Sequence, residues 1–258
     1  MPEVHAILSA SSSKRWLNCT PSARLEQNFP NESSVYAEEG TAAHALGEYK
    51  LRKYLHERVQ RPTSEYENEE MEANTDIYAE FIISTVERIK ETCPHPLVMV
   101  EERLDYSYLV PSGFGTGDCV IIADGTLYVM DYKNGKGVFV SCDHNPQMML
   151  YALGAYHAYG YLYNIKQVSM TISSRDWKIS QRMKVGAEVS RLKVAVASVS
   201  SSSSVRTPSS KSRNSSFTSA RASSAQALQE VLARQNRHQS PGTCSPFPSK
   251  ASFALGLT

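Results

Sequence analysis

Residues 115–122 (GTGDCVII) and residues 127–133 (LYVMDYK) decide the fold that this sequence predicts. Both segments are apolar enough to form buried strands, and Asp124-Gly125 between them is typical of a tight hairpin turn. The first strand carries a carboxylate after a glycine-rich start, and the second ends in Asp-x-Lys. The two segments therefore predict a hairpin with polar side chains at one end.

The polar residues of this hairpin are Asp118, Asp131 and Lys133. Side chains alternate along a strand, so Asp131 and Lys133 share one face and Tyr132 lies on the other. The hairpin can bring Asp118 near the same face. Carboxylates hold a hard divalent cation, and a cation with a lysine can neutralise charge on a phosphate under attack by water. This pattern predicts a metal-dependent phosphodiesterase centre.

The segments around the hairpin predict alternating helices and strands. Apolar residues recur at helical spacing, and further short apolar runs are typical of strands. Pro146 suits the start of a helix. We predict helices over about 35–56, 70–90 and 146–163, and strands over 97–104 and 167–172. This order predicts the α/β class, with a mixed sheet flanked by helices.

The composition excludes some classes of protein and favours others. The 258 residues include 27 Lys and Arg against 26 Asp and Glu, so net charge does not indicate a nucleic-acid binder. No apolar run reaches the roughly 18 residues that a membrane span needs, and no signal peptide is recognisable. The 5 cysteines are odd in number and scattered, which favours a reducing, cytoplasmic setting.

The chain divides by composition near residue 172. Residues 198–224 contain 14 serines, and such a segment cannot bury enough apolar surface to fold. We expect a folded domain over 1–172 and a Ser-rich, basic, low-complexity tail over 173–258. A genuine disordered tail is one explanation of this change in composition, and the explanation that we favour is that the gene is frameshifted near codon 172, so that the domain is incomplete at its C-terminal end. A third interpretation is that residues 186–258 anchor nucleic acid through phosphate contacts.

Two further pairs accompany the hairpin residues. His44 and Glu48 are four residues apart, so they share a helix face, and the same is true of Gln147 and Tyr151. Taken singly, each of these residues is more often structural than functional. Their order along the chain, with the Asp-x-Lys motif between the two pairs, is much less common.

With this order of motifs, the sequence resembles the RecB-like branch of the PD-(D/E)XK nuclease superfamily. Within it, the chain is similar to a phage- and prophage-associated family labelled as a domain of unknown function. The resemblance covers residues 5–172. It rests on four segments: 15–22 (RWLNCTPS), 40–44 (GTAAH), 115–118 (GTGD) and 131–137 (DYKNGKG).

The resemblance implies a restriction-endonuclease-like core and a role for each matching residue. His44, Asp118 and Asp131 would bind Mg²⁺ or Mn²⁺, with the backbone carbonyl of Tyr132 as a further ligand. Lys133 would act with Asp118 and Asp131 in catalysis. The family's pattern also implies that Gln147 and Tyr151 hold the DNA backbone or the site lysine. Glu101 or Glu102, on the preceding strand, can also face the site.

Relatives with this layout often bind an iron–sulfur cluster through four cysteines. Cys19 stands at the N-terminal cysteine position, but no Cys-x-x-Cys follows residue 172, and one thiolate cannot hold a cluster. A cluster is therefore not expected in this chain. We expect Cys19 to be a small buried side chain instead.

The resemblance implies a cytoplasmic, phage-associated DNA nuclease, most simply an exonuclease, that hydrolyses phosphodiester bonds by metal-activated water. DNA and other phage replication or recombination proteins are the expected partners, and no membrane is expected. Two alternatives remain open: a non-catalytic DNA-binding or recombination accessory protein, and an inactive, truncated remnant.

Overall fold

The computed structural model describes residues 6–29, 33–134, 140–174 and 178–184. All of them belong to one compact unit, Met1–Ser210, and the second unit, Lys211–Thr258, lies outside the described residues. The elements in chain order are α1 (Ser13–Asn18), α2 (Ser22–Glu26), α3 (Val35–Tyr54), α4 (Glu69–Lys90), β1 (Leu97–Asp105), β2 (Phe114–Ala123), β3 (Thr126–Lys133), α5 (Pro146–Tyr163), β4 (Gln167–Ser174) and β5 (Lys178–Lys184).

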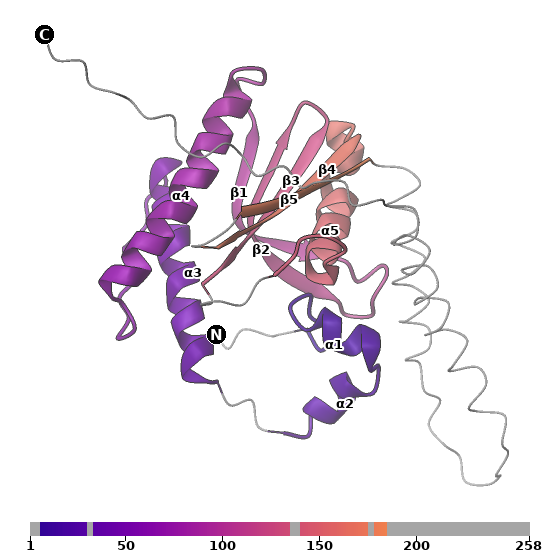
Figure 1. Ribbon diagram of the computed structural model, residues 1–258. Coiled ribbons are helices and arrows are strands. Elements are labelled where there is room, and N and C mark those ends of the chain that lie inside the picture. The colour runs from indigo at the N-terminus through magenta and orange to yellow at the C-terminus, as the bar shows by residue number, and fades with distance from the viewer. Residues whose placement is uncertain (1–5, 30–32, 135–139, 175–177, 185–258) are drawn as a thin grey trace, which may run out of the picture. The chain divides into compact units, whose positions relative to one another are not determined.

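The strands form one mixed sheet in the order β1-β2-β3-β4-β5. Every neighbouring pair is antiparallel except β3 and β4, which run parallel because α5 connects them. Helices α3 and α4 cover one face of the sheet, and α5 covers the other (Figure 1). The predicted α/β class, with a mixed sheet flanked by helices, is confirmed.

The hairpin between β2 and β3 is the predicted one. Ala123 pairs with Thr126, and the two residues between them have positive φ angles, 47° at Asp124 and 69° at Gly125. Two successive positive φ angles define the type I′ turn, whose twist matches that of the flanking strands. The turn fixes the register that sets Cys119 opposite Met130.

The three long helices begin at residues whose side chains satisfy free backbone N–H groups. Ser34 accepts a hydrogen bond from Ala37 N, and Asn68 accepts one from Met71 N. Asn145 accepts from two N–H groups at the start of α5, directly before Pro146. The start of α5 is therefore well defined, and the residue after Pro146 is Gln147, one of the predicted site residues.

The core between the sheet and helices α3 and α4 is apolar and well buried. Strand side chains from alternate positions pack against these helices, because successive side chains of a strand point to opposite faces of the sheet. Among its members are Leu46, Tyr78, Ile82, Val86, Cys119, Ile121, Met130 and Tyr132.

Strands β1 and β2 exchange faces part-way along their length. Val100 packs in the core under α3 and α4, yet Glu102 accepts a hydrogen bond from Tyr159 of α5 (2.7 Å), although strict alternation would place both on one side. On β2, Cys119 lies in the core under α3 and α4, whereas a Cβ at Gly115 would meet Tyr151 of α5. The row at which both strands change faces is therefore Glu101 and Asp118.

The sheet continues past the predicted domain boundary at residue 172. Strand β5 pairs antiparallel with β4 from Gln167↔Lys184 to Ser173↔Lys178. The Ser-rich segment 198–224, Cys244 and the turn at 135–137 lie outside the described residues. In the part of the chain that the structure describes, no helix is both long and apolar enough to cross a membrane.

Candidate metal centre

The candidate site lies where the sheet forks. The pairing of β2 with β3 begins at Cys119↔Met130, while β2 stays paired with β1 as far as Phe114. Strand β3 in turn stays paired with β4 as far as Lys133↔Ser174. Asp118 fills the point of the fork, and its Oδ2 accepts a hydrogen bond from the backbone N–H of Tyr132 at 2.6 Å. The Asp118 side chain thus provides a hydrogen-bond acceptor for the buried N–H of Tyr132, beside the point where the β2–β3 pairing ends.

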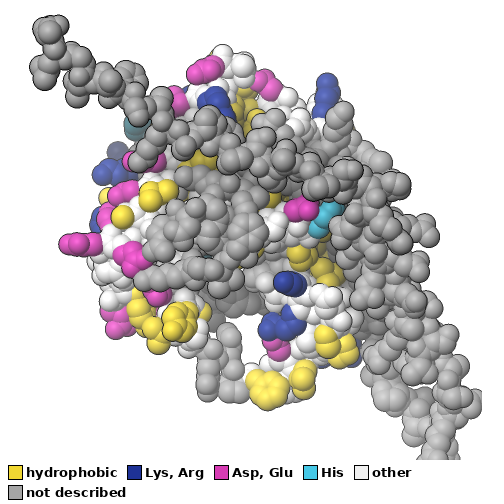
Figure 2. All heavy atoms as spheres, viewed as in Figure 1, with side chains coloured by type: hydrophobic (Ala, Val, Ile, Leu, Met, Phe, Trp, Pro, Cys, Tyr) yellow, Lys and Arg dark blue, Asp and Glu magenta, His cyan; other side chains and the backbone are white. Residues whose placement is uncertain are grey.

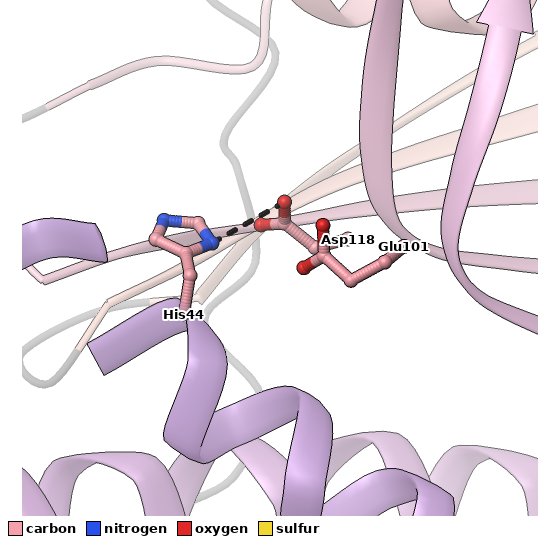
Figure 3. A group of neighbouring side chains, drawn as sticks. All are labelled: His44, Glu101 and Asp118. Atoms are coloured by element: carbon pink, nitrogen blue, oxygen red, sulfur yellow. Dashed lines mark ion pairs between the residues drawn. The ribbon is translucent and has the colours of Figure 1, made fainter. Parts of the chain in front are cut away.

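Three side chains from different elements converge at this fork. His44 comes from α3, Glu101 from β1 and Asp118 from β2, and each offers a ligand atom within 4.8 Å of the others (Figure 3). His44 Nδ1 lies 3.4 Å from Asp118 Oδ1. The histidine therefore reaches across from the helical layer to the row at which the strands change faces.

A second group of side chains extends from β3 to α5. Lys133 Nζ lies 2.8 Å from Asp131 Oδ2 and donates to Gln147 Oε1 at 3.2 Å. Gln147 Nε2 donates to Asp131 Oδ1 and to the hydroxyl oxygen of Tyr151, each at 3.1 Å. Gln147 therefore fixes both the carboxylate and the amine. The shared face of Asp131 and Lys133 is confirmed, and Tyr132 lies in the core on the opposite side.

Burial and crowding of like charges raise the pKa of two carboxyl groups. Burial, followed by the nearby charge of Asp118, raises the pKa of Glu101 to about 7. Burial raises the pKa of Asp131 to about 6, even though Lys133 opposes the shift, and the Asp118 charge adds to it. Burial of several carboxylates close together favours their protonated forms, and a bound cation would favour their ionised forms.

The other two groups respond to their opposite-charge partners. Burial alone would lower the pKa of His44, but the carboxylates of Asp118, Asp131 and Glu101 raise it to about 9. Burial alone would raise the pKa of Asp118, but His44 and the Tyr132 N–H hold it below its usual value. A proton on His44 and a cation at this site would therefore compete for the imidazole.

The donor set fits a hard divalent cation. Asp131 is 1% exposed, and its Oδ2 makes no hydrogen bond of regular geometry although Lys133 Nζ is near. A buried carboxylate oxygen of this kind calls for a further partner. A set of carboxylate oxygens with one imidazole is more suitable for binding Mg²⁺ or Mn²⁺ than for binding a metal that prefers thiolate ligands. His44, Glu101 and Asp118 would hold the ion, with Asp131 beside them.

Glu101 belongs to the cluster, whereas Glu102 bonds to Tyr159 and takes no part in it. The sequence left these two glutamates undecided. A metal-binding role for the Tyr132 carbonyl and a DNA contact by Gln147 or Tyr151 stay predictions. The two glutamates differ in backbone conformation. Glu101 has a φ of 53° and so leaves the regular strand conformation.

Cys19 is exposed, so the prediction that it is buried is wrong. Helix α1 buries Trp16, and a residue three positions later would share that face in a continuing helix. The helix ends at Asn18, however, and Cys19 has a φ of −138° and a ψ of 84°, which turns it away from the helical path.

Aromatic side chains support the centre from both layers. Tyr132 stacks on Tyr78 of α4 with ring centroids 4.8 Å apart, and the ring of His44 meets Tyr132 edge-on at 5.5 Å. On the other side, Tyr151 packs so closely on the backbone of β2 that a Cβ at Gly115 would lie 2.6 Å from its ring. Only glycine leaves room for this contact.

The fold and the site define an α/β protein with a candidate metal centre of one histidine and several carboxylates at a fork in its sheet. The chain belongs to the family described as "Protein of unknown function (DUF2800)", whose profile matches residues 5–236. The match includes residues on both sides of position 172. Among solved structures, the chain is similar to the "Crystal structure of SSO0001", with 10% identity, 74% of this chain and 84% of that chain covered, and a TM-score of 0.26.

Proposed function

We propose that the chain is a Mg²⁺- or Mn²⁺-dependent DNA nuclease of the RecB-like PD-(D/E)XK kind, acting from DNA ends in a phage-associated setting. The observation that carries the proposal is the fork, where the carboxylates of the partly buried Glu101 and the buried Asp118 lie near a lysine held by Asp131 and Gln147. The order of motifs along the sequence supports the same conclusion.

The residues of the site have different tasks in this proposal. His44, Glu101 and Asp118 hold the cation, which when bound supplies positive charge to activate water and to neutralise the phosphate. Lys133 presents an ammonium group at the site, and Gln147 orients it by accepting a hydrogen bond from it at Oε1. A fixed donor beside developing negative charge stabilises the transition state more than a mobile one does.

The visible surface charges suggest that DNA is held mainly at the site itself. On the face shown in Figure 2, Lys and Arg side chains stand beside Asp and Glu side chains. Among the described residues, the Arg15 guanidinium pairs with Glu26, with 2.6 Å between Nη1 and Oε1. Paired charges attract phosphates less than unpaired ones do, so binding should depend strongly on the metal.

Cleavage of defined DNA tests the proposal. The full chain is incubated with Mn²⁺ or Mg²⁺ and with linear single-stranded, linear double-stranded or closed circular DNA. We expect progressive shortening of linear DNA, no cutting of closed circles, and complete inhibition by EDTA. Cutting of closed circles would show endonuclease action, and cleavage that persists in EDTA contradicts metal dependence.

The same measurements separate the alternatives. A DNA-binding accessory protein binds DNA without Mn²⁺, and changes at Asp118 or Asp131 leave that binding intact. An inactive remnant binds Mn²⁺ at the site yet cuts none of the substrates. Wild-type cleavage by a folded Asp131→Ala variant shows that the site is wrongly assigned.

A further inference from the structure

One face of α3 carries three polar residues spaced by single helical turns, His44, Glu48 and Arg52. His44 reaches the metal cluster, and Arg52 Nε bonds to Glu48 Oε1 at 2.7 Å. The metal site as proposed gives a task to His44 alone. The other two lie one and two turns further along the same helix, beside β1.

Arg52 is held rigidly by three contacts. Besides Glu48, its Nη1 donates to Glu57 Oε2 at 2.7 Å, and its Nη2 donates to the backbone carbonyl of Val100 at 2.9 Å. A guanidinium group is planar, so two carboxylates that fix two of its nitrogens also fix the direction of the third. The contact with Val100 therefore has a defined geometry.

The carbonyl that Arg52 binds belongs to the peptide group just before Glu101. Glu101 has a φ of 53°, and its pairing with Asp118 is missing from a ladder that is regular on both sides. A residue other than glycine keeps such a conformation only where its surroundings hold it there. Arg52 supplies a contact at this point, from outside the sheet.

We propose that Arg52, aligned by Glu48 and Glu57, is a positioning residue that holds the Val100–Glu101 peptide so that the Glu101 carboxylate stays in the cluster with His44 and Asp118. This inference rests on the proposed metal-binding function. It adds that the third ligand is held in place by a side chain that does not touch the metal.

The opposing explanation is that Arg52 only ties α3 to β1. The two explanations predict different metal affinities, because Arg52 carries a positive charge near the site. If Arg52 acts only as a tie, its neutralisation should leave Mn²⁺ affinity unchanged or strengthen it by removing repulsion. If it positions Glu101, Mn²⁺ binding should weaken even though a repelling charge is gone.

The experiment measures Mn²⁺ affinity of the full chain by calorimetry, without DNA. We expect Arg52→Gln to bind Mn²⁺ about 10-fold to 100-fold more weakly than wild type, as loss of an outer-shell contact does elsewhere. Arg52→Lys keeps the charge, but its single ammonium nitrogen replaces the three guanidinium nitrogens that each reach a separate acceptor, so it should weaken binding as well. Arg61→Gln is the matched control, since Arg61 pairs with the exposed Glu67 and the partly exposed Glu72 away from the cluster.

A double-variant comparison links the effect to Glu101. If Arg52 acts through this carboxylate, Arg52→Gln should cause no further loss of affinity in a Glu101→Gln background. Additive losses, or wild-type affinity in a folded Arg52→Gln or Arg52→Lys variant, would overturn the inference. Thermal melts identify the folded variants, and Arg52→Lys decides the matter if Arg52→Gln does not fold. Absence of Mn²⁺ binding in the wild type contradicts the proposed function itself, which is a separate result.

Discussion

Glu101 and Asp118 stand opposite each other on β1 and β2, at the single row where both strands change faces. The residues on either side of the row are paired regularly, Val100 with Cys119 and Glu102 with Gly117. The exchange of faces allows carboxylates from the sheet to meet a histidine from the layer of α3 and α4 (Figure 3). The site is therefore built on a local irregularity of the sheet.

Asp118→Asn should abolish cleavage. The amide keeps the size of the side chain but loses the charge that faces His44 and the cation, so we expect at least about a 100-fold lower rate. The rate is measured on end-labelled linear DNA with Mn²⁺. Asp105→Asn, at the exposed end of β1, is the control and should cut like wild type. Equal rates for the two variants exclude Asp118 from the site.

Lys133→Met should separate catalysis from metal binding. The lysine donates to Gln147 and pairs with Asp131 but is not expected to bind the cation, so cleavage should fall about 100-fold to 1,000-fold. Mn²⁺ affinity, measured by calorimetry, should stay the same or increase. The exposed Lys166→Met should change neither quantity. A Lys133→Met variant that loses Mn²⁺ binding while folded contradicts this division of tasks.

Stabilisation by Mg²⁺ should grow with pH. The pKa of His44 is raised to about 9, so its contribution to stability without metal is complete below its ordinary pKa of 6.5 and is lost as pH rises through 9. The raised pKa of Glu101, about 7, and that of Asp131, about 6, act in the same direction, because these groups destabilise the fold once ionised. Mg²⁺ binds the deprotonated forms and reverses this loss.

The difference in melting temperature with Mg²⁺ and with EDTA is the quantity to measure, at pH 6 and at pH 8.5. We expect a rise of at least a few degrees at pH 8.5 and a smaller one at pH 6, since about 1 kcal/mol corresponds to roughly 2–4 °C for a domain of this size. Asp118→Asn serves as the control and should show little Mg²⁺ effect at either pH. An equal rise at both pH values in the wild type would count against proton competition.

Gly115→Ala should destabilise the protein, whereas Gly40→Ala should not. A Cβ at Gly115 would lie 2.6 Å from the ring of Tyr151, whereas one at Gly40 meets nothing within 4 Å. We expect the free energy of unfolding to fall by about 1–3 kcal/mol for Gly115→Ala. Alanine within helix α3 should raise it by up to about 1 kcal/mol. Urea unfolding of both variants checks this, and equal stabilities would show that Tyr151 does not pack on β2 as described.

The frameshift hypothesis makes a prediction about the gene. An alternative frame near codon 172 should continue the domain beyond the last predicted strand. Sequencing the coding DNA checks this directly. If no alternative frame extends the domain, residues 173–258 are the genuine continuation of the chain.

The elements of the fold could be predicted from local sequence signals. The Asp124-Gly125 turn, the Pro146 helix start and the apolar spacing of α4 each depend on neighbouring residues only. Strand β5 was not predicted, because its residues 178–184 have a polar composition and form a strand by pairing with β4. Tertiary pairing decides such segments, and local propensity does not.

The candidate site could be predicted only in part. The Asp-x-Lys motif and the helical pairs place His44, Asp131 and Gln147 on faces that the structure brings together. The choice of Glu101 over Glu102 could not be predicted, because strict alternation continued from Val100 gives no warning that the strand changes faces. The contact from Arg52 to the Val100 carbonyl joins residues 48 positions apart and leaves no pattern in the sequence.

The site is assembled from two parts of the chain that come together only in the finished fold. Asp131, Lys133 and Gln147 lie within 17 consecutive residues of β3 and α5, whereas His44 and Glu101 come from α3 and β1. If α3 separates from the sheet, Lys133 can still pair with Asp131, but His44 no longer lies at the site. A partly unfolded chain is then an inert one, so the same contacts that complete the centre also restrict its chemistry to intact molecules.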